Sequence, residues 1–146
     1  MYIDYALVLK HGWNGLWRSI NGNDPDQIVM VDGEDAPTKK ELDNYWDAHK
    51  IEIQKETWRK SVSLSRRKFK VGISLYEIDG ENLKTKIESA LESLPEPHKT
   101  IAQVSYEDGT EFERMDDMVV MLAQEIGLSD EEVDDFFEWA NNEEWR

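Results

Sequence analysis

At three places in this 146-residue chain, a Ser or Thr that stands three residues before a Glu also stands at the start of a stripe of apolar residues at helical spacing. In such a capping box the hydroxyl accepts a hydrogen bond from the third amide, and the Glu carboxylate accepts one from the cap amide. The boxes are Thr38–Glu41, Thr110–Glu113 and Ser129–Glu132. They predict helices that begin near residues 38, 110 and 129, so the chain must contain amphipathic helices that share a core.

Apolar residues at spacings of three and four extend this prediction to other parts of the chain. The first stripe reaches to about residue 60 and consists of Leu42, Tyr45, Trp46, His49 and Ile53. Further stripes predict helices around residues 65–76, 83–94, 110–126 and 129–140. Pro95 and Gly127 follow two of these stripes and are typical of helix ends. The apolar residues between Ile101 and Tyr106 are too few for an assignment.

The first forty residues have a different pattern. Residues 1–12 fit either a short helix that ends at Gly12 or a first strand, and the helix is favoured. Two aromatic and β-branched runs, Trp13–Ile20 and Gln27–Asp32, flank the turn-forming segment Asn21–Asp26. This arrangement predicts a β-hairpin.

Together these elements predict an α+β fold. A small amino-terminal β-hairpin with one or two helices precedes a carboxy-terminal bundle of short helices. The short polar break Ser61–Ser65 is the candidate hinge between the two halves. We therefore predict an α+β amino-terminal region at residues 1–61 and a helical carboxy-terminal region at residues 62–146.

The charge of the chain argues against several classes of partner. The net charge is −15, and residues 101–146 alone hold 15 acidic and 2 basic side chains. A surplus of carboxylates disfavours binding to nucleic acid and to anionic membranes. This acidic third of the chain, residues 101–146, either keeps the protein solvated or forms a surface that is complementary to a basic partner. With no run of eighteen apolar residues and no signal-like start, we expect a soluble protein made in the cytoplasm.

The residues that usually perform catalysis show no recognisable pattern. The chain has no cysteine, and His11, His49 and His98 are far apart in the sequence without a His-x-x-x-His pair. Zinc is therefore not expected, and His49 is predicted to pack in the core. No nucleophile elbow and no glycine-rich phosphate loop occurs in the sequence. We predict no catalytic, cofactor-binding or metal-binding residue, and a protein that is not an enzyme.

Three tryptophans are the candidate partner-binding residues. Trp13 and Trp17 are four residues apart and face the same side of a strand or of a helix. They either fill the core of the amino-terminal half or leave an aromatic patch for a partner. Trp145 lies beyond a polar pair and either folds back on the helices or docks on another subunit. The basic stretch Ser65–Lys70 is expected to pair with the acidic third rather than with nucleic acid.

Two groups of segments carry a resemblance to a known kind of protein. The weaker match is Ala36–Leu42. The stronger matches are ordered and spaced as in a recurrent module, and they are Ser65–Phe69, Leu94–Pro97, Tyr106–Arg114 and Ile126–Phe137. In these segments the chain resembles small proteins that tailed bacteriophages and prophages encode with their tail or tail-fibre genes. Many such proteins have a proline soon after the Phe-Glu-Arg sequence, where this chain has Met115–Met118. This leaves open whether the helix starts at Thr110 or restarts near Asp116.

The matched residues themselves suggest an architectural role. The apolar ones are expected to be core residues, namely Phe69, Leu94, Phe112 and Phe136. The charged ones are expected to form bridges between helices, namely Arg66, Arg67, Glu111 and Glu113.

The resemblance implies a viral structural or assembly protein. Its expected partners are phage tail or tail-fibre proteins, with a homo-oligomer as a further possibility, and its expected location is the virion tail or the host cytoplasm during assembly. The alternative hypothesis is an acidic decoy that imitates nucleic acid and occupies a basic surface of a host nucleic-acid-binding protein.

Overall fold

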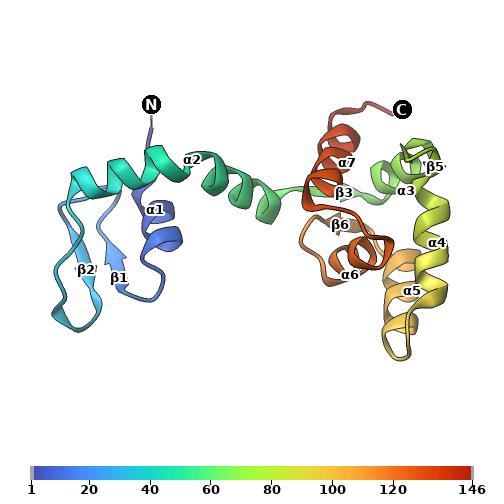
Figure 1. The fold of residues 1–146 in the computed structure, drawn as a ribbon, viewed down its shortest axis with the longest axis horizontal. Helices are drawn as coiled ribbons and strands as arrows, with labels where there is room; N and C mark the ends of the chain where they lie inside the picture. Colours follow the sequence, from blue (N-terminus) through green and yellow to red (C-terminus); the bar gives the residue numbers. More distant parts are fainter. Residues whose placement is uncertain (1, 146) are drawn as a thin grey trace. The chain divides into compact units, whose positions relative to one another are not determined.

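The computed structural model describes residues 2–145 and divides the chain into two compact units (Figure 1). Across these residues it contains seven α-helices and three antiparallel pairs of short strands. The predicted α+β class is confirmed. One unit ends at Thr57 and the other begins at Trp58. The division lies inside α2 (Lys39–Ser61), four residues before the predicted boundary.

The amino-terminal unit begins with helix α1 (Tyr5–Gly12). The carboxylate of Asp4 accepts hydrogen bonds from the amides of Ala6 and Leu7, which have no partner within the helix. Of the two structures that the sequence allowed for residues 2–12, the favoured helix is therefore present. The capping Asp4 explains why an otherwise strand-like apolar run begins a helix.

The predicted hairpin follows, with β1 (Trp17–Ile20) antiparallel to β2 (Ile28–Met30). Its first strand begins later than predicted, because the amide of Leu16 donates to the carbonyl of Trp13 and closes a turn there. The 3₁₀ turn η1 (Val31–Gly33) ends the hairpin.

Helix α2 begins at the first capping box. The Glu41 amide donates to Oγ1 of Thr38, and the Thr38 amide donates to Oε2 of Glu41, both over 3.2 Å. The core of this unit lies between α1 and the first part of α2. It consists of Tyr5, Val8, Leu9, Leu42, Trp46 and Ile53.

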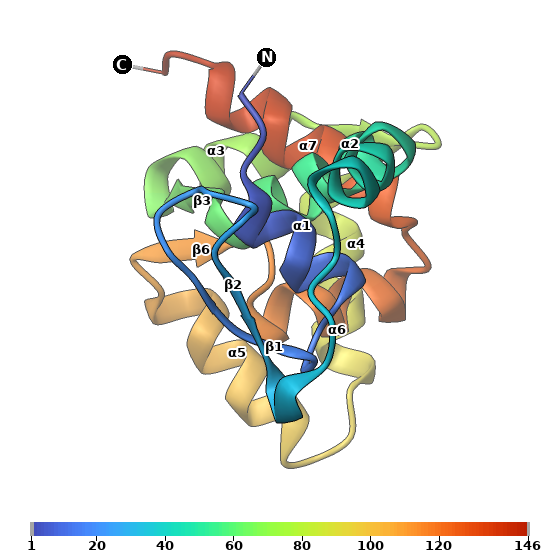
Figure 2. The same ribbon diagram turned by 90° about the vertical axis from the view of Figure 1, so that its left-hand side faces the viewer.

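The carboxy-terminal unit contains five of the helices and two of the strand pairs (Figures 1 and 2). Its elements are β3 (Ser63–Ser65), α3 (Arg66–Leu75), β4 (Glu77–Ile78), β5 (Glu81–Asn82), α4 (Leu83–Ser93), α5 (His98–Asp108), β6 (Glu111–Glu113), α6 (Asp117–Ile126) and α7 (Asp130–Asn142). Four of the predicted helices are present as α2, α3, α4 and α7. Helix α5 covers the stretch that the sequence left unassigned.

The prediction of a helix beginning at Thr110 is wrong. Residues Glu111–Glu113 form strand β6, in which Phe112 lies opposite Leu64 of β3. Both of these side chains are buried, whereas the two glutamates of β6 are exposed. This alternation is the two-residue period of a strand. The helix restarts at Asp116, whose carboxylate accepts a hydrogen bond from the Met118 amide.

The polar break Ser61–Ser65 is also ordered rather than a free linker. The Val62 amide donates to the Trp58 carbonyl, and the Arg114 amide donates to the Val62 carbonyl. Strand β3 then pairs with β6, so most of the predicted hinge belongs to regular structure.

An aromatic cluster forms the centre of the carboxy-terminal core. The rings of Phe69 and Phe112 stack with centroids 4.0 Å apart, and Phe136 meets Phe69 edge-on at 6.2 Å. A Cβ at Gly72 would lie 3.2 Å from the Phe136 ring, so glycine there allows α3 and α7 to pack closely. The four apolar residues predicted as core residues, Phe69, Leu94, Phe112 and Phe136, are all buried.

The predicted bridges among the matched charged residues are not formed within residues 2–145. Arg66, Arg67 and Glu113 are exposed, and Glu111 instead accepts a hydrogen bond from Oγ of Ser63 over 2.6 Å. None of the helices in these residues combines the length and the hydropathy that crossing a bilayer requires.

Candidate functional site

The predicted partner-binding tryptophans all pack against the core of their own unit. The ring of Trp13 lies 5.1 Å from that of Tyr45, and Trp17 also packs against the amino-terminal core. Trp145 folds back so that its ring lies 5.4 Å from that of Trp139. All three remain half-buried, so each ring fills the edge of a core and leaves only part of its surface to solvent.

An apolar surface that the sequence did not reveal lies on α5. Ile101 and Val104 are one helical turn apart, and they are 58% and 52% exposed. Ala102 and Tyr106 of the same helix are buried. Helix α5 thus contacts α4 and α6 through one face and presents two β-branched side chains on another. We call the residues Ile101 and Val104 the α5 apolar face.

Ordered polar contacts lie near the start of this helix. Lys99 Nζ lies 3.0 Å from a carboxylate oxygen of Glu92, and Oγ1 of Thr100 donates to Glu96 over 2.7 Å. An apolar centre beside a polar border is the arrangement found in protein-binding surfaces.

The hairpin of the amino-terminal unit has a smaller apolar surface. Leu16 and Val29 are 46% and 51% exposed, whereas Met30 in β2 is buried. Each unit therefore presents apolar side chains of its own to solvent.

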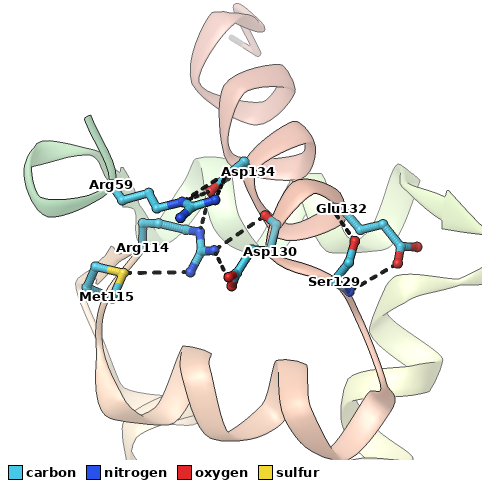
Figure 3. A network of polar contacts seen from close by, with 7 residues as sticks. All are labelled: Arg59, Arg114, Met115, Ser129, Asp130, Glu132 and Asp134. Carbon is cyan, nitrogen blue, oxygen red and sulfur yellow. Dashed lines mark hydrogen bonds and ion pairs between the residues drawn. The ribbon is translucent and has the colours of Figure 1, made fainter. Parts of the chain in front are cut away.

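A buried charged network joins three elements of the carboxy-terminal unit (Figure 3). Arg114 Nε donates to Oδ1 of Asp134 over 2.9 Å, and Arg59 donates to both oxygens of the same carboxylate over 2.7–3.0 Å. Arg114 also donates to the carbonyl and the carboxylate of Asp130 at the start of α7. The network fixes α7 against the last turn of α2 and the segment between β6 and α6.

The ionisation of Asp134 follows from these contacts. Burial of the carboxylate by itself raises the pKa of Asp134, but the hydrogen bonds from Arg59 and Arg114, together with the positive charges of these arginines, outweigh burial. The pKa of Asp134 therefore lies below its ordinary value, and the side chain is ionised at neutral pH. Since both arginines bind the Asp134 carboxylate and hold α7 to its neighbours, we interpret the network as structural.

Lys70 forms a second unusual contact. Its ammonium group lies 3.1 Å from the centroid of the Tyr106 ring. Burial, followed by the positive charges of Arg66 and Lys84, lowers the pKa of Lys70. Burial likewise raises the pKa of the Tyr106 hydroxyl, with Glu88 and Glu107 adding to the effect.

The carboxy-terminal core leaves a partly open apolar cavity of about 40 Å³ between α3, α4, α6 and α7. Phe69, Met118, Leu122 and Phe137 are among its lining residues. Binding pockets for small molecules usually measure roughly 300–1,000 Å³. The cavity is therefore a packing defect rather than a ligand pocket.

Two of the three histidines lie side by side, although they are far apart in the sequence. The rings of His11 on α1 and His49 on α2 have centroids 5.7 Å apart. His11 also faces Glu52 and Glu56, and the three ligand atoms lie within 4.8 Å of one another. These residues could hold a metal ion. The spacing of the histidines does not indicate this cluster, and the signal present in the sequence is the pair Glu52 and Glu56 at positions i and i+4.

Comparisons of the chain with known protein families, with curated proteins and with solved structures find no match.

Proposed function

We propose that the protein is a structural or assembly component of a bacteriophage tail that acts by binding other tail or tail-fibre subunits. The α5 apolar face is the observation that carries the proposal. Two β-branched side chains on one turn are each more than half exposed. Their contact with water is unfavourable in the isolated chain, and a partner that covers them removes this unfavourable free energy.

The segments that resemble phage tail proteins support this proposal through their structural role. Ser65–Phe69 contributes the cap and the first core residue of α3, and Tyr106–Arg114 contributes β6 and the buried Arg114. Ile126–Phe137 provides the end of α6 and the capped start of α7. The resemblance thus concerns the residues that build the carboxy-terminal unit, which is the unit that presents α5.

The test uses the full chain and the tail and tail-fibre subunits encoded beside it. The double variant Ile101→Glu with Val104→Lys leaves the net charge unchanged and adds an i,i+3 pair that suits a helix. We expect this double variant to fold as the parent does. It should bind the tail or tail-fibre subunit that the parent binds at least about tenfold more weakly, since a central apolar contact of the interface is lost. Leu75→Gln is the matched control, because Leu75 is 59% exposed but lies on α3.

The result that would overturn the proposal is equally specific. If the α5 double variant and the Leu75→Gln control bind every tail and tail-fibre subunit as the parent does, the α5 apolar face is not an interface. If the parent itself binds none of these subunits, the assignment to the tail is wrong.

The geometry of α7 favours a second candidate, the acidic decoy. Glu131, Asp135 and Glu138 are exposed and follow one another at i, i+4 and i+7, so one face of α7 carries a row of carboxylates. A decoy that relies on such charges should release its basic target as salt screens them. A tail complex with an apolar centre should instead survive about 0.5 M salt, where the Debye length is about 4 Å.

A further inference from the structure

The side chains around His11 converge on one point in the amino-terminal unit. Nε2 of His11 lies 3.7 Å from Oε1 of Glu52 and 3.6 Å from Oε1 of Glu56. The two glutamates are one turn apart on α2, and His11 is in the last turn of α1. The His11 side chain is only 16% exposed, so its ring is held within the unit.

Two neighbouring groups orient these side chains. Nδ1 of His11 lies 2.8 Å from the hydroxyl of Tyr45, a hydrogen bond that occupies this nitrogen and leaves Nε2 toward the carboxylates. Nδ1 of His49 lies 3.4 Å from Oε2, the other oxygen of Glu52. Metal-binding histidines and carboxylates are usually oriented by hydrogen bonds of this kind from a second layer of residues.

The distances fit three ligands of one ion better than direct hydrogen bonds. An N–H···O hydrogen bond measures about 2.7–3.2 Å, and both distances from Nε2 are longer. Ligand atoms about 2.1 Å from a tetrahedral zinc ion lie roughly 3.4 Å from one another. Moreover, the carboxylate oxygens of Glu52 and Glu56 lie within 4.8 Å of each other, and two such negative charges repel one another unless a positive charge lies near them.

We propose that His11, Glu52 and Glu56 bind a divalent first-row transition metal, with zinc as the best match. The imidazole selects zinc over magnesium and calcium, which prefer sets of oxygen ligands alone. Three protein ligands leave a fourth position for water.

The metal would act as a cross-link between α1 and α2. The amino-terminal unit has six residues in its buried core, and the chain has no cysteine with which to form a disulfide. Small units with limited cores often rely on such a cross-link for stability. This inference is independent of the function proposed for α5.

Calorimetric titration of the metal-stripped full chain with zinc chloride at pH 7.5 tests the proposal. We expect one ion per chain, and an affinity that falls at least about tenfold in His11→Ala and in Glu56→Gln. Glu56→Gln keeps the size of a half-buried side chain, so it separates lost binding from lost folding. His98→Ala and Asp47→Asn are matched controls, since both residues are exposed and lie outside the cluster.

A thermal melt provides a second readout. Zinc at a hundredfold excess over its Kd should raise the Tm at which α1 and α2 unfold by on the order of 10 °C in the parent, and by much less in Glu56→Gln. Unchanged zinc affinity in both cluster variants would overturn the proposal, because binding would then come from the acidic surface in general. Magnesium binding as tight as zinc binding would overturn it as well.

Discussion

Arg114 and Asp134 form a hydrogen-bonded ion pair over 2.9 Å, and both residues are more than nine-tenths buried. Charges so far from water are tolerated only when they are paired and their remaining polar atoms have partners. Here Arg59 and Asp130 provide those partners. The packing of α7 therefore depends on a small set of charged groups.

We predict that Asp134→Ala destabilises the protein by about 3–5 kcal/mol, because it leaves the buried guanidinium of Arg114 without its counter-charge. Urea denaturation followed by circular dichroism measures the change. Asp135→Ala is the matched control, since the adjacent carboxylate is exposed. Its free energy of unfolding should stay within about 0.5 kcal/mol of the parent. Equal losses in the two variants would contradict the structural role of the network.

The same carboxylate predicts a dependence on pH. The pKa of Asp134 is lowered in the folded state, so its contribution to stability is complete above the unfolded value of about 3.9. The contribution is lost as the pH falls through the lower, folded value. The difference in free energy of unfolding between the parent and Asp134→Ala should therefore be constant from pH 7 to about pH 5 and shrink below pH 4. A difference that grows on acidification would show that the carboxylate is not ionised in the fold.

Phe137→Ala should be among the most damaging apolar substitutions. The side chain is 1% exposed and lines the apolar cavity together with Met118 and Leu122, so truncation enlarges a space that already exists. Removing a buried phenylalanine costs about 3–5 kcal/mol. Leu75→Ala, on an exposed position of α3, should change the free energy of unfolding by less than about 0.5 kcal/mol. Chemical denaturation of both variants provides the comparison.

Amide hydrogen exchange should show that the segment between α2 and α3 is protected. The amides of Val62 and Arg114 donate to carbonyls at the junction with β3, whereas Gly22 lies exposed at the turn of the hairpin. We expect the first two to exchange far more slowly than Gly22. Rapid exchange at Val62 would contradict this expectation and would support the hinge that the sequence predicted at Ser61–Ser65.

Most helices could be predicted because their signals are local. The Thr38 and Ser129 boxes form both of their reciprocal hydrogen bonds, as the sequence indicated. The Thr110 box failed because its Glu-Phe-Glu sequence also fits a strand, and pairing with β3 buries Phe112 against Leu64. Only the position of β3 in the fold decides between the two structures, and that position is not encoded within the segment.

The candidate sites were harder to predict for the same reason. The candidate partner-binding residues were three large aromatic side chains, Trp13, Trp17 and Trp145. Their exposure depends on which neighbours cover them, and the sequence does not show this. The α5 apolar face belongs to a helix that the apolar pattern was too short to indicate. The cluster around His11 joins α1 to α2, so it requires the contact between these helices before any spacing rule can find it.

The pairing of β3 with β6 also bears on when the second unit can fold. Leu64 and Phe112 are far apart in the sequence, and Phe136 packs against Phe69 from a still later helix. On the ribosome, α1, the hairpin and the first part of α2 can assemble while α3 to α7 are still being translated. The aromatic core of the second unit is incomplete without Phe136 of α7, so we expect chains that lack α7 to leave Phe69 partly uncovered.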